Sequence, residues 1–170
     1  MDLIVRTQSN SPLATAEWDG RVMACLVGRS GPISAAEKRE GDGATPLGRW
    51  KVLYGMYRAD RVAKPAGGLV WKAITREDGW CDAPDDPLYN QFVPVGYHAS
   101  HEVLWREDTA YDYIVVLDHN QPVKPAMGSA VFMHVWHPEK THTAGCVALG
   151  VGDLQRVLAT LGVGDGVVVG

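Results

Sequence analysis

The sequence predicts a mainly β domain, either a sandwich or a distorted barrel, with one clear helix on the C-terminal side and a long loop region. Short apolar segments separated by Gly, Pro, Asn and Asp recur along the chain, which is typical of strands joined by turns. Only residues 154–161 show a convincing helical repeat. The 170 residues, 46% hydrophobic and 21% charged, fit one globular domain over 1–170, without linker or repeat.

The first extended segments can be placed in chain order. Residues 3–7 and 21–27 are predicted to be extended, and Trp18-Asp19-Gly20 predicts a turn between extended segments. Residues 41–48 contain several glycines and a proline, which predicts a loop. The aromatic and apolar run at 50–57 that follows predicts a strand.

A long segment without a clear repeat occupies the middle of the chain. Between residues 58 and 100, proline and glycine recur at short intervals among several tryptophans, which predicts an elaborated loop region with short strands. Loops of this length in a compact domain are usually functional. Further strands are expected at 102–106, 111–117, 130–136 and 166–169.

The helix is predicted from apolar residues that recur at i, i+3, i+4 and i+7, namely Leu154, Val157, Leu158 and Leu161. Gly152-Asp153 precede this repeat and Gly162 follows it, as expected for the two ends of a helix.

Composition and charge exclude several classes of partner. The net charge is −4, the pI is about 5.8, and no basic run is present, so we expect neither a nucleic-acid nor an anionic-membrane partner. No apolar stretch approaches the roughly 18–20 residues of a membrane span. Residues 1–6 carry an acid where a signal peptide has basic residues, so we expect a chain exported by a route other than Sec, not exported, or a mature fragment.

The three cysteines, Cys25, Cys81 and Cys146, form neither an even set nor a CxxC pair. At least one thiol is therefore expected to be free. Cys25 lies in an apolar run and is expected in the core, and Cys81, beside a tryptophan, is expected to be a packed thiol.

The most informative segment runs from His134 to Leu149. A histidine ends an apolar strand, and a polar loop then returns to Thr-Ala-Gly-Cys at 143–146. A thiol needs a base or a positive neighbour to become a thiolate, and imidazole can serve as both. Gly145 permits a tight turn whose bare N–H groups could stabilise an oxyanion. The alternative is that Cys146 is a buried structural thiol and His134 an ordinary strand residue.

The segment resembles the signature of the YkuD-type L,D-transpeptidase family, in which a histidine is followed by a Ser/Thr-x-Gly-Cys block. Residues 143–146 match that block, His134 stands where the catalytic histidine is expected, and 42–48 (Asp-Gly-Ala-Thr-Pro-Leu-Gly) are similar to the family's D-x-x-T-P-x-G turn. Further landmarks resemble one proteobacterial branch: Arg58-Ala59-Asp60-Arg61, Gly79-Trp80-Cys81-Asp82, Tyr89-Asn90, His101-Glu102 and Tyr111-Asp112.

The resemblance implies a mechanism without a metal or an organic cofactor. The Cys146 thiolate would attack a peptide carbonyl of a peptidoglycan stem to form a thioester, and the amine of an acceptor diaminopimelate would then resolve it. His134 would act as general acid and base, oriented by the Val135 carbonyl. The N–H groups of Gly145 and Cys146 would stabilise the oxyanion, and Thr143 would support the loop. The resemblance also implies action in the periplasm or cell wall, and we expect a monomer.

The sequence departs from the family at two positions near the nucleophile. Ala144 and Ala148 stand where members more often carry histidine and a substrate-binding arginine or asparagine. This departure favours a 1–3 crosslink, whose donor carbonyl is that of L-Ala, over a 3–3 crosslink. We expect the substrate pocket to be built from residues of the long loop region, namely Arg58, Arg61, Trp80, Asp82, Asn90 and His101.

Other functions remain open at the level of sequence. Water could replace the amine, which would give a carboxypeptidase or endopeptidase, or a secreted wall-modifying effector of the same fold. A non-catalytic peptidoglycan-binding module is a further alternative. A metal-binding protein is another, because zinc accepts sets of nitrogen and sulfur ligands; the candidate ligands are His134, His137, His142 and Cys146, with His98 and His101.

Overall fold

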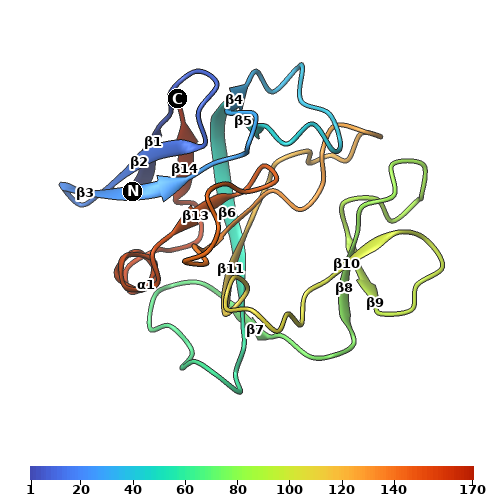
Figure 1. The fold of residues 1–170 in the computed structure, drawn as a ribbon. Coiled ribbons are helices and arrows are strands. Elements are labelled where there is room, and N and C mark those ends of the chain that lie inside the picture. The colour runs from blue at the N-terminus through green and yellow to red at the C-terminus, as the bar shows by residue number, and fades with distance from the viewer.

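The computed structural model describes residues 1–170 and shows a mainly β domain with one helix (Figure 1). The strands are β1 (Asp2–Arg6), β2 (Leu13–Trp18), β3 (Arg21–Leu26), β4 (Pro32–Ile33), β5 (Thr45–Pro46), β6 (Gly48–Tyr57), β7 (Trp71–Ala73), β8 (Asp78–Cys81), β9 (Phe92–Pro94), β10 (His101–Val103), β11 (Tyr113–Leu117), β12 (Phe132–Val135), β13 (Val147–Leu149) and β14 (Gly166–Val169). The helix is α1 (Val151–Leu158). The expected fold class is therefore confirmed.

The main sheet closes on itself, which makes the domain a distorted barrel rather than a sandwich. Its strand order is β11-β12-β13-β3-β2-β1-β14-β6-β7, and an additional pairing joins β11 to β6. The long strand β6 makes this closure possible, because residues 48–51 pair with β14 and residues 52–57 pair with β11. Most pairings are antiparallel, whereas β12 lies parallel to β13.

Alternation along the strands divides the buried side chains between the two faces of the sheet. Tyr113 and Val115 of β11 belong to the large interior cluster, whereas the intervening Ile114 belongs to a second cluster on the outer face. Both clusters are continuous sets of buried apolar residues. The domain thus has one core inside the barrel and another beneath the layer that covers it.

Helix α1 packs into the interior cluster through Leu154, Val157 and Leu158, as the apolar repeat predicts. It begins at Val151, with Gly150 as the N-cap, and no side chain caps it. The helix thus starts before the expected Gly152-Asp153 cap and ends at Leu158, and Leu161 is buried in the same cluster beyond its end.

The covering layer is formed by the middle of the chain. Strands β8, β9 and β10 form a separate three-stranded sheet beside the barrel (Figure 1). Trp80 of β8 packs edge-on against Phe132 of β12, with ring centroids 5.0 Å apart. The expected loop region with short strands is therefore present, and it covers the sheet beside β12.

Three short elements differ from the expectation. The two-residue strand β5 lies within the predicted loop 41–48, and neither the two-residue strand β4 nor β13 was predicted from the sequence. A strand of three residues is too short to show an alternating pattern, so only its pairing with β12 and β3 identifies it. None of the structure's helices has the length and apolar character of a membrane span.

Candidate active site

The parallel pair β12–β13 places His134 and Cys146 on the same face of the sheet. His134 pairs in register with Ala148, and Cys146 lies two residues before Ala148 in the chain. Because side chains alternate along a strand, residues 146 and 148 share a face, and that face also carries His134. The spacing of neighbouring strands, about 4.8 Å, brings the thiol and the imidazole into one cavity.

The Cys146 thiol is buried and hydrogen-bonded as a neutral group. Its S–H donates to the Ala130 carbonyl at 3.2 Å, and its sulfur accepts the Phe132 N–H at 3.4 Å. Burial raises the pKa of Cys146 to about 12. The hydrogen bond from the Phe132 N–H acts in the opposite direction, because it stabilises the thiolate and lowers the pKa. The resting residue is therefore a thiol at neutral pH.

His134 is held in one orientation by the backbone of the next residue. Its Nδ1 lies 2.8 Å from the Val135 carbonyl, and its ring meets Tyr111 edge-on at 5.4 Å between centroids. Since a carbonyl only accepts, this contact assigns the proton to Nδ1 and leaves the lone pair on Nε2. Burial lowers the pKa of His134 to about 4, so the imidazole is neutral at pH 7.

These two neutral groups line one cavity, and we call them the thiol–imidazole pair. Burial disfavours the charged form of each group and so favours the neutral thiol and the neutral imidazole. A neutral imidazole with a free Nε2 can take a proton from a thiol as the sulfur attacks a carbonyl. The arrangement is therefore suited to coupled proton transfer and nucleophilic attack.

The turn before Cys146 is fixed by one hydroxyl. Thr143 Oγ1 donates to the Cys146 carbonyl at 2.7 Å and accepts the Gly145 N–H at 3.1 Å. The N–H of Gly145, which was expected to face an oxyanion, is therefore already bonded within the turn. The N–H of Cys146 has no acceptor within the protein. The N–H of Cys146 is thus a free donor next to the sulfur.

Gly145 also has a steric reason to be glycine. Its φ is +142°, and a Cβ at this position would lie 2.9 Å from the carbonyl oxygen of Ala44. Any side chain would therefore be strained in its backbone and would push the turn away from residue 44.

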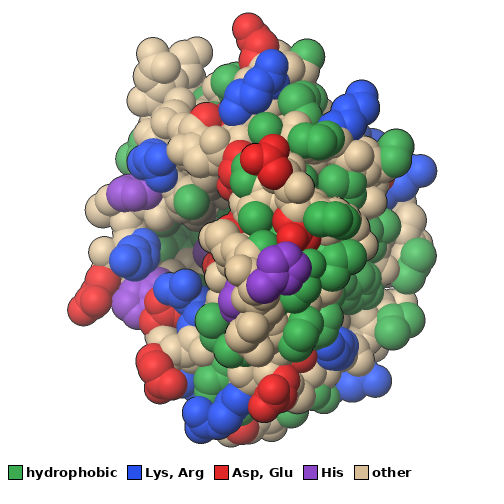
Figure 2. Space-filling model, turned by 90° about the vertical axis from the view of Figure 1, so that its right-hand side faces the viewer, with side chains coloured by type: hydrophobic (Ala, Val, Ile, Leu, Met, Phe, Trp, Pro, Cys, Tyr) green, Lys and Arg blue, Asp and Glu red, His purple; other side chains and the backbone are tan.

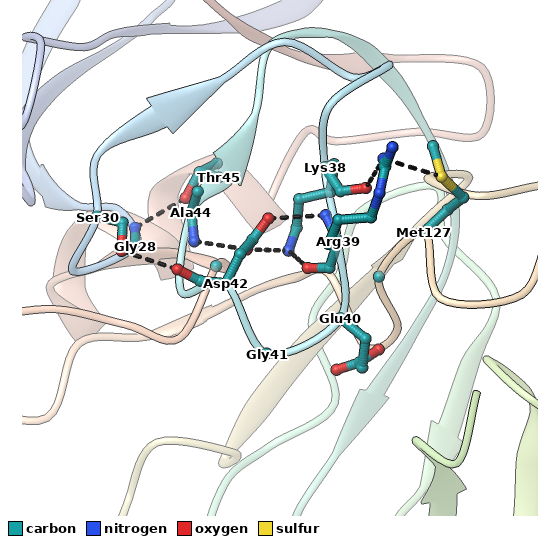
Figure 3. A network of polar contacts seen from close by, with 12 residues as sticks. Gly28, Ser30, Lys38, Arg39, Glu40, Gly41, Asp42, Ala44, Thr45 and Met127 are labelled. Carbon is teal, nitrogen blue, oxygen red and sulfur yellow. Dashed lines mark hydrogen bonds and ion pairs between the residues drawn. The ribbon is translucent and has the colours of Figure 1, made fainter.

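The upstream Asp-x-x-Thr-Pro-x-Gly segment packs against this turn, and Figure 3 shows its residues Asp42, Ala44 and Thr45 beside Gly28. Thr45 Oγ1 accepts the N–H of Gly28 at 2.8 Å, and Gly28 forms a parallel bridge with Thr143. A Cβ on Gly28 would lie only 2.2 Å from the Gly43 carbonyl oxygen, so the two backbones approach too closely for any other residue. The two signature segments, about a hundred residues apart in the chain, therefore form one structural unit.

The site opens into a cavity of about 530 Å³. Figure 2 shows histidines and charged side chains of both signs around a hollow on one face of the molecule. Besides the pair itself, the cavity is lined by His137, His142 and Trp136. Its charged lining residues are Arg29, Lys38, Arg106 and Lys140, with the acids Glu40, Asp82, Glu102 and Asp108.

Of the six residues expected to bind substrate, only Asp82 lines this cavity. Its Oδ1 is buried and has no hydrogen-bond partner. Arg58 is 2% exposed because its guanidinium binds Asp60 and the Arg106 carbonyl and stacks on Trp105. Arg58 is thus held within the covering layer and does not line the cavity.

The remaining four are also held within the covering layer. Arg61 donates to backbone carbonyls of the 107–108 segment and to Asp112. Buried Trp80 donates its indole N–H to buried Asn90 at 3.0 Å, and the Asn90 amide donates to the His119 carbonyl. The His101 ring bonds to the Ala99 carbonyl and the Gly96 N–H. Their polar groups are thus used to build the layer that covers the site.

Several residues of the cavity were not singled out from the sequence. Tyr111 packs against His134, and its hydroxyl donates to Glu102, the residue paired with Trp80 between β10 and β8. Tyr111 and Glu102 both belong to residue pairs that resemble one branch of the family, and this resemblance was the one signal in the sequence that could have identified them. Lys38 lies in a run of charged residues that looks like ordinary solvent-exposed surface.

Metal ligation was one alternative for the histidines and Cys146. The structure gathers no group of three or more His, Cys, Asp or Glu side chains in an arrangement that could hold a metal ion.

Comparison with known proteins identifies the fold. The family model "L,D-transpeptidase catalytic domain", YkuD, matches residues 9–169. No curated protein and no solved structure gives a match. Since the family match spans almost the whole barrel and both signature segments, the chain belongs to the L,D-transpeptidase catalytic domain family, YkuD.

Proposed function

We propose that this protein is a peptidoglycan L,D-transpeptidase that works through a thioester on Cys146, with His134 as general acid and base. The observation that carries the proposal is the neutral thiol–imidazole pair in one cavity of a YkuD domain. Val135 would keep the His134 ring in place, because its carbonyl binds Nδ1 and leaves Nε2 free for the thiol proton.

The first half-reaction forms the acyl-enzyme. Nε2 of His134 takes the thiol proton while the Cys146 sulfur bonds to the donor carbonyl carbon, whose oxygen becomes an oxyanion. The C–N bond then breaks, and the proton on His134 passes to the departing amine. The products are a thioester on Cys146 and a released peptide fragment.

The second half-reaction transfers the acyl group to an amine. The side-chain amine of an acceptor diaminopimelate attacks the thioester carbonyl, His134 takes its proton, and the C–S bond breaks to return the thiol. The free Cys146 N–H would stabilise the oxyanion in both half-reactions. Thr143 would act by holding the Gly145–Cys146 turn, since its hydroxyl bonds to both residues.

We propose a 1–3 crosslink as the product, formed by a monomer that acts on the cell wall in the periplasm. Ala148 lines the cavity where many family members place a longer polar side chain, so the donor is held by other groups. The exposed Lys140 at the cavity, which forms no side-chain hydrogen bond within the protein, offers a free cation for a stem-peptide carboxylate.

The test is incubation of the protein with disaccharide-peptide muropeptides, followed by liquid chromatography and tandem mass spectrometry. A crosslinked dimer is expected with the parent protein, and it should be absent with Cys146→Ala. His134→Gln should form far less of the dimer, whereas the matched control His98→Gln, at an exposed histidine outside the cavity, should behave as the parent.

The fragmentation pattern separates the possible products. A bond from L-Ala to diaminopimelate would support the 1–3 product, and a bond between two diaminopimelates would show the 3–3 product instead. Shortened monomers without dimers would replace the transferase by a hydrolase. An unchanged substrate in every sample would contradict enzymatic action on these muropeptides.

A further inference from the structure

Lys38 is a buried cation outside the thiol–imidazole pair. Its residue is 3% exposed, although lysine is among the residues least often buried. Nζ donates to Asp42 Oδ1 at 2.5 Å and to the Arg39 carbonyl at 2.8 Å (Figure 3). Removing an ammonium from water is costly, so a site that buries one has a strong structural requirement or a functional use for it.

The side chain of Lys38 lies against the turn that carries the nucleophile. It lines the same cavity as Cys146. A Cβ built on Gly145 would lie 4.0 Å from Lys38 Cε, and one built on Gly128 would lie 3.2 Å from the same atom. The lysine stem therefore fills the space between the Gly145 turn and the 126–130 segment.

Asp42 connects the lysine to the segment that packs against the turn. Its Oδ1 also accepts the N–H of Ala44 at 2.9 Å, and its Oδ2 accepts the N–H of Arg39 at 2.7 Å. Burial opposes ionisation of Asp42, but the Lys38, Ala44 and Arg39 donors outweigh it and hold the carboxyl pKa below its usual value. Because the Ala44 carbonyl is the group that meets Gly145, Asp42 links Lys38 to the turn.

We propose that Lys38 is a positioning residue for Cys146: anchored by Asp42, it holds the Gly145 turn against residue 44 and its ammonium favours the thiolate that forms during acyl transfer. The proposal rests on Cys146 being the nucleophile. Glutamine or methionine could fill the same space, so it is the charge that requires a functional explanation.

The surroundings of the sulfur show why such a cation is useful. Burial is the main influence that raises the pKa of Cys146, and the carboxylate of Glu102 raises it further, whereas the charge of Lys38 lowers it. Tyr111 and His134 are further titratable groups that line the cavity of the thiol, and His119 and Asp42 are those beside Lys38. Lys38 is the cation that counters burial at this sulfur.

The experiment measures how readily the Cys146 thiol ionises, without any peptidoglycan substrate. The rate of alkylation by iodoacetamide is followed at fixed pH values from 7 to 10, with peptide mass spectrometry to score labelling at Cys146 alone. Since the thiolate is the reactive species, the rate at each pH reports the thiolate fraction.

Lys38→Met keeps the stem and removes the charge, and we expect alkylation of Cys146 about tenfold slower at each pH, since a nearby charge shifts a pKa by about one unit or more. Asp42→Asn keeps an acceptor for Ala44 but no longer neutralises the ammonium, so alkylation should become faster. Lys64→Met, at an exposed lysine outside the cavity, is the matched control and should leave the rate unchanged.

Opposite shifts in the two variants would establish the electrostatic role, because a merely structural role would not reverse sign. Equal rates in the parent and in folded Lys38→Met would overturn the proposal. If Lys38→Met does not fold, Asp42→Asn decides alone: a rate equal to or below that of the parent overturns it. Failure of the parent in the muropeptide assay, with these shifts intact, would instead refute the proposed function.

Discussion

The two faces of the main sheet carry different kinds of core. Inside the barrel the buried cluster is almost wholly apolar, and α1 closes it through Leu154 and its neighbours. On the outer face the second cluster includes Cys146 and lies beside His134 and the Tyr111–Glu102 pair. The same alternation along β11, β12 and β13 supplies both faces. The barrel interior therefore provides stability, and the covered outer face provides a desolvated place for ionisable groups.

This division predicts that removing the reactive groups destroys activity with little effect on folding. Cys146→Ala should abolish transpeptidation, and His134→Gln should reduce it by about a thousandfold, since general acid–base catalysis contributes about 10²–10⁴ in rate. Turnover of muropeptides and thermal unfolding would be measured on the same samples. Normal turnover by folded His134→Gln would contradict the role of the imidazole.

Substitutions in the barrel interior are expected to lower stability rather than to remove a reactive group. Leu154 is fully buried, and Leu154→Ala should lower the free energy of unfolding by about 3 kcal/mol, through lost burial and the cavity left behind. Val151→Ala on the same helix, at a residue 49% exposed, is the matched control and should change it by less than about 0.5 kcal/mol. Urea unfolding measures both; equal effects would show that α1 is not anchored by this face.

The outer face should also make stability depend on pH. The folded-state pKa of His134 is depressed to about 4. The neutral imidazole therefore contributes fully to the free energy of unfolding above about pH 6.5, the usual pKa of histidine, and this contribution is lost as the pH falls toward 4. The loss is on the order of 2 kcal/mol. Burial lowers the pKa of His119 in the same direction, so the difference between the parent and His134→Gln isolates His134.

Urea unfolding at pH 7, 5.5 and 4 provides this comparison. His134→Gln should lose less stability than the parent between pH 7 and pH 4. The pKa of Asp108 is held at about 2, chiefly by the hydrogen bonds from Arg106. Its contribution to the free energy of unfolding is therefore lost only below pH 4, outside the range of this experiment. Parallel pH curves for the parent and the variant would contradict an imidazole that desolvation keeps neutral.

The smallest effect on stability is expected at the turn before Cys146. Gly145→Ala should cost about 1–2 kcal/mol, because the residue has a positive φ and its Cβ would press on the Ala44 carbonyl. Gly20→Ala is the matched control, with φ +73° and open space around its Cβ. The two variants should differ mainly in activity, which Gly145→Ala should lose and Gly20→Ala should keep. Equal activities would show that residue 44 does not position Cys146.

Sequence reasoning predicted the parts of the fold that repeat locally. The apolar repeat gave α1, and the alternating runs gave strands such as β6 and β11, because burial on one face imposes a period on the chain. Closure through the β11–β6 pairing and the three-residue strand β13 depend on contacts between distant segments. No local pattern encodes such contacts.

In the candidate site, the sequence predicted the two central residues but not the residues around them. The resemblance to the YkuD signature was enough to expect His134 and Cys146 in one site, whereas Arg58 and Asn90 were expected at the substrate and instead bind the backbone carbonyls of residues 106 and 119. A charged or amide side chain in a loop has the same sequence appearance whether it meets a ligand or an internal carbonyl. Lys38 illustrates the converse, since only the fold shows that this lysine is buried.

Intact-protein mass spectrometry tests the central claim most directly. The protein would be incubated with a donor muropeptide without acceptor, and its intact mass would be measured. The same sample would then be digested, and peptide mapping would locate the modified residue. We predict one covalent adduct on Cys146, with the mass of the donor up to its L-Ala carbonyl and with the rest of the stem released. Turnover of the donor with no adduct on Cys146, or with an adduct on another residue, would contradict the account.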